Sequence, residues 1–167
     1  MEALIAAGSN IDGEINLARA RTLLAAHPAI NLRACSPLYI TAAIGADGAP
    51  ANQPPFYNAA FRVATTLHAA DLRRMLRTIE AQLGRVRSAD KFAPRPIDLD
   101  IAYYGLSALH IENKPVPDDD VVRYAHVAAP LADVAPEWLH PVTGQTLAAI
   151  AQPWANQPLE KRSWTLI

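Results

Sequence analysis

The sequence predicts an α+β sandwich of the ferredoxin-like type, with helices packed on a mainly antiparallel sheet. Segments with the two-residue period of strands and segments with helical spacing follow one another in the order β-α-β-β-α-β. The 167 residues contain neither an internal repeat nor a flexible linker that would separate two cores. We therefore expect residues 1–167 to form one domain.

The first part of the chain predicts a strand, a helix and a second strand. Residues 2–8 (EALIAAG) are a short apolar run that ends in glycine, which is typical of a buried strand. Residues 10–27 show near-helical spacing of apolar side chains, and Pro28 ends that helix. Residues 30–41 alternate as a strand that Pro37 interrupts. Residues 42–55, rich in Gly, Ala and Pro, predict a long loop of the kind that often binds ligands.

The second part predicts the remaining elements of the sandwich. Residues 56–67 alternate as a third strand, and residues 68–85 form an amphipathic helix that ends at Gly84. Residues 85–96 form a second loop, and residues 97–105 form a fourth strand. Residues 106–111 favour a fifth strand, and residues 120–128 a short helix.

Charge is concentrated in one segment of a nearly neutral chain. A net charge of −1 argues against a general nucleic-acid or membrane-surface role, which usually depends on a sustained positive field. Seven of the fifteen Lys and Arg residues nevertheless lie between Arg73 and Arg95, opposed there only by Glu80 and Asp90. This distribution indicates an anion-binding site.

Cysteine content and hydropathy bear on location. Cys35 is the only cysteine, so the sequence holds neither an intrachain disulfide nor a thiolate metal cluster. There is no run of eighteen apolar residues, and the N-terminus lacks the cationic start of a signal peptide. We expect a cytoplasmic protein without membrane or nucleic-acid partners, monomeric, with a dimer as the alternative.

The most informative stretch is residues 84–105, GRVRSADKFAPRPIDLDIAYYG. Asp98 and Asp100 are two residues apart on a strand, so both project to one face. Two carboxylates so placed repel each other unless a cation compensates, and Mg²⁺ is a usual compensator when phosphates complete its shell. The alternative is a solvated strand face without a metal.

The cations that precede the two acids favour the metal interpretation. Phosphoryl transfer needs carboxylates for the metal and guanidinium groups for the oxygens that gain charge. Arg95 lies between two prolines, which limit where its side chain can reach. Arg85 and Arg87 could instead complement the dipole of the preceding helix, and Lys91 and Phe92 could simply be solvated.

Four strings, in their order along the chain, resemble the 6-hydroxymethyl-7,8-dihydropterin pyrophosphokinase family. They are AAGSN (residues 6–10), FYNAA (56–60), GRVR followed by KFAPRPIDLDI (84–101), and APLADVAPEWLHP (129–141). The resemblance implies an enzyme of folate biosynthesis that moves the β,γ-pyrophosphoryl group of ATP onto the hydroxymethyl group of a reduced pterin, using two Mg²⁺ ions.

Matching by motif position also implies roles for individual residues. Asp98 and Asp100 would hold the metal ions, and Arg85 and Arg95 would act on the migrating phosphates. The remaining assignments concern the two ligands: Glu80, Arg87, Lys91 and Arg123 for the nucleotide, and Thr41, Ile44, Phe56, Asn58, Phe92 and His126 for the pterin. Taken alone, Phe56 is better explained by a core position, and His126 by a structural or surface one.

The sequence departs from the family pattern mainly in residues 113–126. Asp118 stands where the family has His, and it begins a run of three acids that would repel a triphosphate unless they face outward or cap the next helix. Tyr124 and Asn113 stand where the family has Arg, with Arg123 and Lys114 beside them. His126 stands where the family has an aromatic residue that stacks on the pterin.

These departures leave two alternatives to the pyrophosphokinase. The first is a divergent paralogue that uses a modified pterin or another nucleotide donor. The second is a non-catalytic pterin-binding or protein-interaction module, against which the retained Asp98, Asp100, Arg85 and Arg95 argue, because such a module needs no metal pair.

Overall fold

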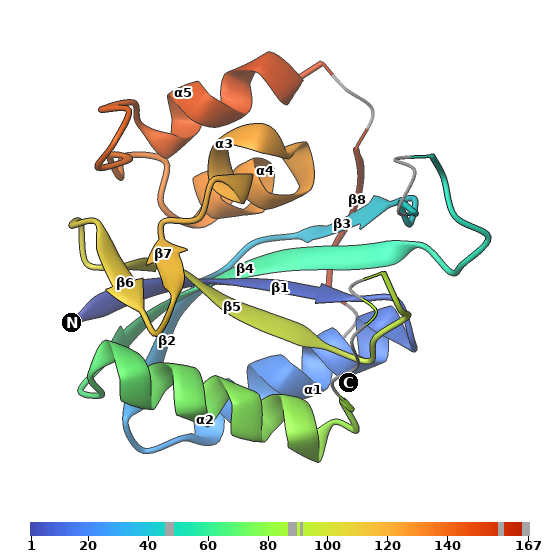
Figure 1. Ribbon diagram of the computed structural model, residues 1–167, viewed down its shortest axis with the longest axis horizontal. Helices are drawn as coiled ribbons and strands as arrows, with labels where there is room; N and C mark the ends of the chain where they lie inside the picture. The colour runs from blue at the N-terminus through green and yellow to red at the C-terminus, as the bar shows by residue number, and fades with distance from the viewer. Residues whose placement is uncertain (46–48, 87–89, 91, 157–158, 165–167) are drawn as a thin grey trace.

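One twisted antiparallel sheet forms the centre of the molecule (Figure 1). The computed structural model describes residues 1–45, 49–86, 90, 92–156 and 159–164. The strands of the sheet lie in the order β5-β1-β4-β3-β8, and β2 also pairs with β4. All these pairings are antiparallel, which confirms the predicted fold class. The strands are β1 (Glu2–Ser9), β2 (Ile30–Cys35), β3 (Leu38–Thr41), β4 (Phe56–Thr65), β5 (Asp98–Tyr104) and β8 (Glu160–Arg162).

Helices cover both faces of the sheet, so the molecule has three layers (Figure 1). Helices α1 (Gly13–Ala26) and α2 (Ala69–Gln82) pack on one face. The other face carries α3 (Asp120–Arg123), α4 (Ala125–Val134) and α5 (Leu147–Ala151), followed by the 3-10 turn η1 (Gln152–Trp154). The covering helices leave one end of the sheet to the loops that follow β1 and precede β5.

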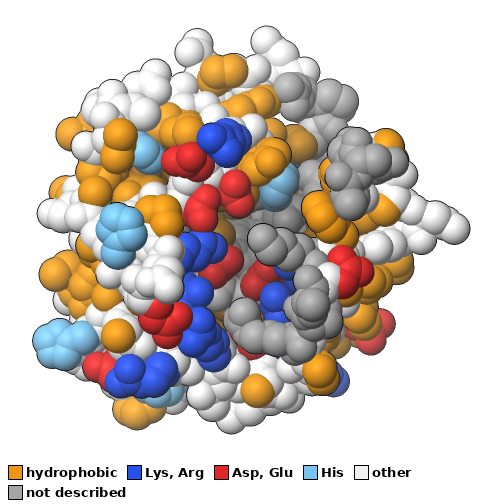
Figure 2. All heavy atoms as spheres, in the orientation of Figure 1, with side chains coloured by type: hydrophobic (Ala, Val, Ile, Leu, Met, Phe, Trp, Pro, Cys, Tyr) orange, Lys and Arg blue, Asp and Glu red, His pale blue; other side chains and the backbone are white. Residues whose placement is uncertain are grey.

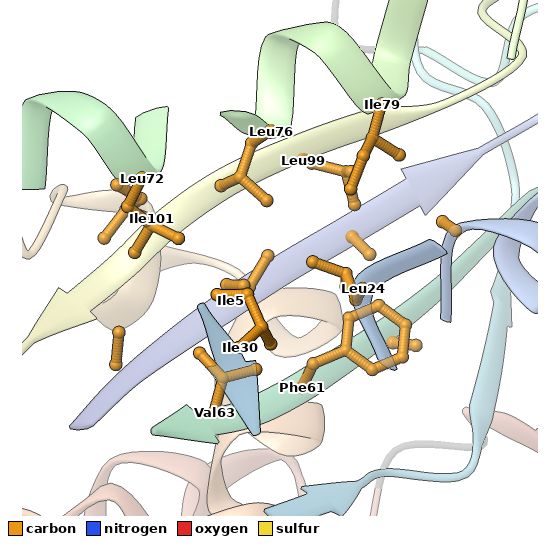
Figure 3. Close-up of a cluster of buried hydrophobic side chains, with 14 of the residues drawn as sticks. Ile5, Leu24, Ile30, Phe61, Val63, Leu72, Leu76, Ile79, Leu99 and Ile101 are labelled. Atoms are coloured by element: carbon orange, nitrogen blue, oxygen red, sulfur yellow. The ribbon is translucent and has the colours of Figure 1, made fainter. Parts of the chain in front are cut away.

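The alternating side chains of the shared strands build two cores. On the α1–α2 side, Leu99 of β5 lies against Leu76 and Ile79 of α2, and Phe61 of β4 lies beside Leu24 of α1 (Figure 3). Leu4 and Ala60, each one residue before a member of this core, point the other way and pack with α4 and α5. Because a strand presents successive residues to opposite faces, one sheet supplies both cores.

The sequence interpretation differs from the structure at three places. The predicted strand 30–41 is two strands, β2 and β3, because Ser36 turns the chain: its hydroxyl accepts the Ala60 N–H at 2.9 Å. The predicted helix 120–128 is split at Tyr124, whose backbone is extended, and α4 continues to Val134. The predicted fifth strand shortens to β6 (Leu109–Ile111), which pairs outside the main sheet with β7 (Lys114–Val116).

A search for membrane-spanning helices is negative for the part of the chain that the structure describes. Every helix there is too short or too polar to cross a bilayer.

Candidate functional site

Asp98 and Asp100 extend from β5 toward the same side of the sheet. They are paired in register with Gly8 and Ala6 of β1, while the intervening Leu99 is buried in the opposite core. The predicted side-by-side placement of the two carboxylates is therefore confirmed. Both are half-buried, with exposed side-chain fractions of 28% and 40%.

The two carboxylates line a cavity of about 520 Å³ at the end of the sheet. Figure 2 shows acidic and basic side chains gathered around a hollow in the middle of this face. The cavity unites residues that are far apart in the sequence. Its lining includes Ala6, Gly8, Thr41, Ile44, Phe56, Asn58, Arg95, Asp98, Asp100, Asp120 and His126.

Asp98 binds two guanidinium groups, one at each carboxylate oxygen. Arg85 Nη1 lies 2.7 Å from Oδ1, and Arg95 Nη1 lies 2.9 Å from Oδ2. Charge-assisted hydrogen bonds of this length are among the stronger ones in proteins. The predicted proximity of Arg85 and Arg95 to the acid pair thus holds for Asp98.

Glu80 supports this arrangement from behind β5. Its carboxylate is buried, with 2% of the side chain exposed, and Oε1 accepts the Leu99 N–H at 2.8 Å. The same oxygen lies 3.7 Å from Arg85 Nη1, which also donates to the Ile97 carbonyl at 2.5 Å. Glu80 therefore contacts Arg85 and the backbone between the two aspartates, and does not line the cavity.

The end of β1 fixes the loop that carries Arg95. Ser9 Oγ donates to the Pro96 carbonyl at 2.6 Å, and Asn10 Oδ1 accepts the Arg95 N–H at 2.7 Å. The Asn10 amide also donates to Gln53 Oε1 at 3.3 Å, while Gln53 Nε2 donates to the Phe92 carbonyl at 3.1 Å. The string GSN thus ties together the two loops that border the cavity.

Asp100 is paired with cations from outside the predicted loop. Lys114 Nζ of β7 lies 3.1 Å from Oδ2, and Arg73 Nη1 of α2 lies 3.9 Å from Oδ1. Lys114 also lies 3.5 Å from Asp118 Oδ2. Burial disfavours the ammonium, but the attraction of Asp100 and Asp118 outweighs it and raises the pKa of Lys114.

The apolar end of the cavity carries groups that suit a flat heterocycle. Asn58 donates through Nδ2 to Thr41 Oγ1 at 3.0 Å and to the Tyr39 carbonyl at 3.2 Å, which leaves its amide oxygen as the acceptor for a ligand. Phe56 stands two residues before it, and the Arg95 guanidinium lies 5.8 Å from the centre of its ring. Ile44 adds an apolar wall.

His126 lines the opposite wall of the cavity. Its ring stacks on Tyr124, with 5.4 Å between ring centres and 27° between planes. Burial lowers the pKa of His126, which favours the neutral imidazole near pH 7. Burial, reinforced by the charge of Asp118, raises the pKa of the neighbouring Asp120.

Two other predicted site residues, Arg123 and Phe92, are not among the described residues that line the cavity. Arg123 is exposed and pairs with Asp119 at 3.1 Å. Phe92 is 44% exposed, and the described lining of the cavity does not include it. Arg87 and Lys91 lie outside the described residues.

Sequence reasoning missed the contributions of Arg73, Lys114, Gln53 and Asp120. In the sequence, Arg73 stands out only as part of the basic segment, and Lys114 only as the neighbour of Asn113, where the family has arginine. Helical spacing does carry a signal for Arg73, because it shares the strand-facing side of α2 with Glu80, seven residues later. No local pattern marks the other three.

Comparison with known proteins agrees with this geometry. Residues 4–136 match the model of the family described as 7,8-dihydro-6-hydroxymethylpterin-pyrophosphokinase (HPPK). A 2-amino-4-hydroxy-6-hydroxymethyldihydropteridine pyrophosphokinase of Bacillus subtilis is 35% identical over 133 residues, which cover 79% of this chain and 77% of that protein.

Other similar proteins are much longer. A folic acid synthesis protein of Pneumocystis carinii is 43% identical over 98 residues, covering 59% of this chain but only 13% of that protein. The Plasmodium falciparum HPPK-DHPS structure with pteroate has a TM-score of 0.71 at 13% identity, and the match covers 93% of this chain and 44% of that one. This structural likeness concerns the fold.

The fold and the site define a class of α+β proteins in which two carboxylates, paired with arginines, lie at a cavity at the end of an antiparallel sheet. Within that class, the chain belongs to the 7,8-dihydro-6-hydroxymethylpterin-pyrophosphokinase family.

Proposed function

We propose that this chain catalyses the Mg²⁺-dependent transfer of the β,γ-pyrophosphoryl group of ATP to the hydroxymethyl group of 6-hydroxymethyl-7,8-dihydropterin. One observation carries the proposal: a single cavity joins Asp98, Asp100 and Arg95 with Phe56 and Asn58. Charged groups for a triphosphate and groups for a planar heterocycle thus share one space, as a transfer between two bound substrates requires.

The donor set of the two aspartates suits magnesium. Mg²⁺ prefers oxygen ligands and is commonly bound by one or two carboxylates, with waters and substrate phosphates completing its shell. We propose that Asp98 and Asp100 hold two ions, which would neutralise phosphate charge when bound. The remaining ligands would be waters and phosphate oxygens of the nucleotide.

The arginines have the placement for binding the transferred group. Arg85 and Arg95 lie on either side of Asp98, so a metal-bound phosphate at that carboxylate would lie within reach of both guanidinium groups. Such preorganised donors stabilise charge that develops during transfer. The resemblance implies that Glu80 contacts the nucleotide. Because Glu80 contacts Arg85 and β5, we propose that it also positions Arg85.

Binding of the pterin would involve the other end of the cavity. Phe56 offers a ring face, and the amide oxygen of Asn58 offers an acceptor to an N–H of the heterocycle. We propose that Thr41 orients the Asn58 amide through its hydroxyl. Ile44 and His126 would enclose the ligand from the long loop and from α4.

His126 supports the alternative of a modified substrate. A neutral imidazole in the cavity wall can stack, but it can also hydrogen-bond a pterin substituent, which a purely hydrocarbon ring cannot do. A panel of 6-substituted dihydropterins would distinguish the two. A preference of more than tenfold for a substrate other than the hydroxymethyl compound would favour the paralogue.

The transfer is tested by its products and by one carboxylate variant. With Mg²⁺, ATP and the hydroxymethyl pterin, we expect AMP and a pyrophosphorylated pterin in equal amounts. Asp98→Ala should lower the rate by about three orders of magnitude, because metal clamping contributes several kcal/mol at the transition state. Release of ADP alone would contradict the proposal.

A matched control separates this effect from general loss of charge. Asp71 is an exposed aspartate of α2 that pairs with Arg74, away from the cavity. Asp71→Ala should leave turnover within about twofold. A non-catalytic module would show no AMP with any variant.

Three further expectations stay predictions. We propose that residues 1–167 act as one domain, since both cores are built on the same strands. The cytoplasmic location and the monomeric state, with a dimer as the alternative, are tested by cell fractionation and by sedimentation.

A further inference from the structure

The β6–β7 hairpin brings a lysine to Asp100 from outside the loops that the motifs mark; the lysine contacts this lining residue and is not itself among the described residues that line the cavity. Lys114 Nζ lies 3.1 Å from Asp100 Oδ2 and 3.5 Å from Asp118 Oδ2. The Lys114 side chain is 30% exposed, so it is partly accessible to solvent. A cation here is adjacent to one of the two metal-binding candidates.

The position of this lysine is fixed by the rest of the fold. Glu112, in the hairpin turn, binds Arg77 of α2 through both carboxylate oxygens at 3.1 and 2.8 Å. Glu112 Oε2 also lies 3.4 Å from Arg73 Nε. The φ of Glu112 is +57°, where Asn or Gly is usually favoured, so the backbone of the turn is held in this conformation at some energetic cost. These contacts attach the hairpin to α2 and keep Lys114 at Asp100.

The acid run beside this lysine is largely compensated within the protein. Asp118 pairs with Lys114, and Asp119 pairs with Arg123 at 3.1 Å. The repulsion of a triphosphate that the sequence suggests is therefore reduced at Asp118 and Asp119, whereas Asp120 lines the cavity. Asp118 instead acts as a second anchor that keeps the ammonium near Asp100.

We propose that Lys114 is a phosphate-binding residue of the transfer site. Asp118 holds its ammonium group near Asp100. When a metal ion binds the Asp100 carboxylate, the ammonium exchanges that carboxylate for a phosphate group of the nucleotide. This inference rests on the proposed function. A divalent ion at Asp100 competes with the ammonium for the same oxygens, and the nearest new anion for Lys114 is then a phosphate oxygen bound to that ion. Lys114 thereby supplies a cation where the sequence has Asn113 and Tyr124 at family arginine positions.

A purely structural role makes a different prediction. If Lys114 only neutralises Asp100 and Asp118, its loss lowers stability but leaves the affinity for a metal-bound triphosphate unchanged. Any change that arises from altered metal affinity should then be the same for nucleotides with long and short phosphate chains. The two roles are separated by comparing the affinities of Mg²⁺ with α,β-methylene-ATP and with AMP.

The experiment uses calorimetry on Lys114→Met, with Lys114→Arg as the charge-retaining variant. Lys114→Met should weaken binding of Mg²⁺ and α,β-methylene-ATP by about 10- to 100-fold, because a charge-assisted hydrogen bond is lost. Affinity for AMP should change by less than about twofold. Lys114→Arg should recover most of the affinity for the triphosphate analogue.

Lys161→Met is the control, since Lys161 lies 4.0 Å from an aspartate, Asp133, but outside the cavity. Triphosphate affinity of Lys114→Met equal to that of the wild type would overturn the inference, even if the wild type forms AMP. Absence of AMP from the wild type would instead overturn the proposed function. The affinities for the triphosphate analogue and for AMP would then still show whether Lys114 binds phosphate. If Lys114→Met does not fold, Lys114→Gln is measured with the same outcomes.

Discussion

Asp98 illustrates how one side chain can serve two states of a site. Each of its oxygens takes one guanidinium, from Arg85 and Arg95, at hydrogen-bonding distance. A carboxylate oxygen has two lone pairs, so a metal ion and a guanidinium can share it. The arginines compensate Asp98 in the structure, and under the proposed function the same groups would lie beside the phosphates.

Arg95 and Phe56 face each other in the cavity, but their truncation to alanine should affect different steps, catalysis for Arg95 and pterin binding for Phe56. Arg95→Ala should lower kcat by about 100-fold, because a guanidinium near the transferred group acts mainly at the transition state. Phe56→Ala should instead raise the Kd of the pterin by about tenfold with a smaller effect on kcat.

Steady-state kinetics and pterin titration check this split. Arg74→Ala, an exposed arginine of α2, serves as the control for charge removal. Equal losses of kcat in the Arg95 and Phe56 variants would contradict the assignment of the two residues to different substrates.

At the scale of elements, the cavity depends on loops that are fastened to the end of β1. Ser9 and Asn10 are almost completely buried, and their side chains bind the loop before β5 and the loop before β4. A loop that is held by buried hydrogen bonds keeps its ligand groups in place. Ser9 and Asn10 of the GSN motif therefore contribute to the site by fixing the position of Arg95.

Asn10→Ala tests this connection. The change leaves the Arg95 N–H without its side-chain acceptor, which should lower the free energy of unfolding by about 1–3 kcal/mol. Activity should fall further than this destabilisation explains, because Arg95 loses its fixed position. Asn31→Ala, at an exposed site of β2, should change neither property in urea unfolding or activity assays.

The sequence predicted what depends on neighbours along the chain. The side-by-side placement of Asp98 and Asp100 follows from strand alternation, and the fold class follows from the order of the elements. Lys114 could not be predicted to reach Asp100, because that contact depends on how the hairpin is attached to α2. Likewise the split at Tyr124 and strand β8 reflect tertiary packing, since neither has a strong local period.

At the scale of the whole molecule, two cores share one sheet and differ in polarity. The core under α4 and α5 contains Tyr103 and His140, whose rings meet edge to face at 6.2 Å. His140 is 5% exposed, and its Nδ1 accepts the Thr143 N–H at 3.2 Å. Burial, opposed weakly by Asp119, lowers the pKa of His140. Protonation of Nδ1 would also remove this hydrogen bond.

This histidine predicts a pH dependence of stability. Because its folded pKa lies below that of the unfolded chain, the unfolded state takes up more protons as the pH falls. The stabilisation is present above the ordinary histidine pKa and is lost as the pH falls through the folded value. The free energy of unfolding should therefore drop between pH 7 and pH 5, and less so in His140→Gln.

Urea unfolding at both pH values measures the difference. His110→Gln, at an exposed position of β6, should keep the wild-type pH dependence. An unchanged slope in His140→Gln would show that other groups account for the acid sensitivity.

Gly8 of β1 stands in register between Asn58 on one neighbouring strand and Asp98 on the other. A methyl group there would meet Asn58 Oδ1 at 3.5 Å and Phe56 Cδ1 at 3.8 Å, contacts that a folded chain tolerates. The cavity wall at Gly8 is thus bare backbone, between the strand that carries Asn58 and the strand that carries Asp98. If the two substrates bind as proposed, an alanine at this position should narrow the space between them while the fold stays intact.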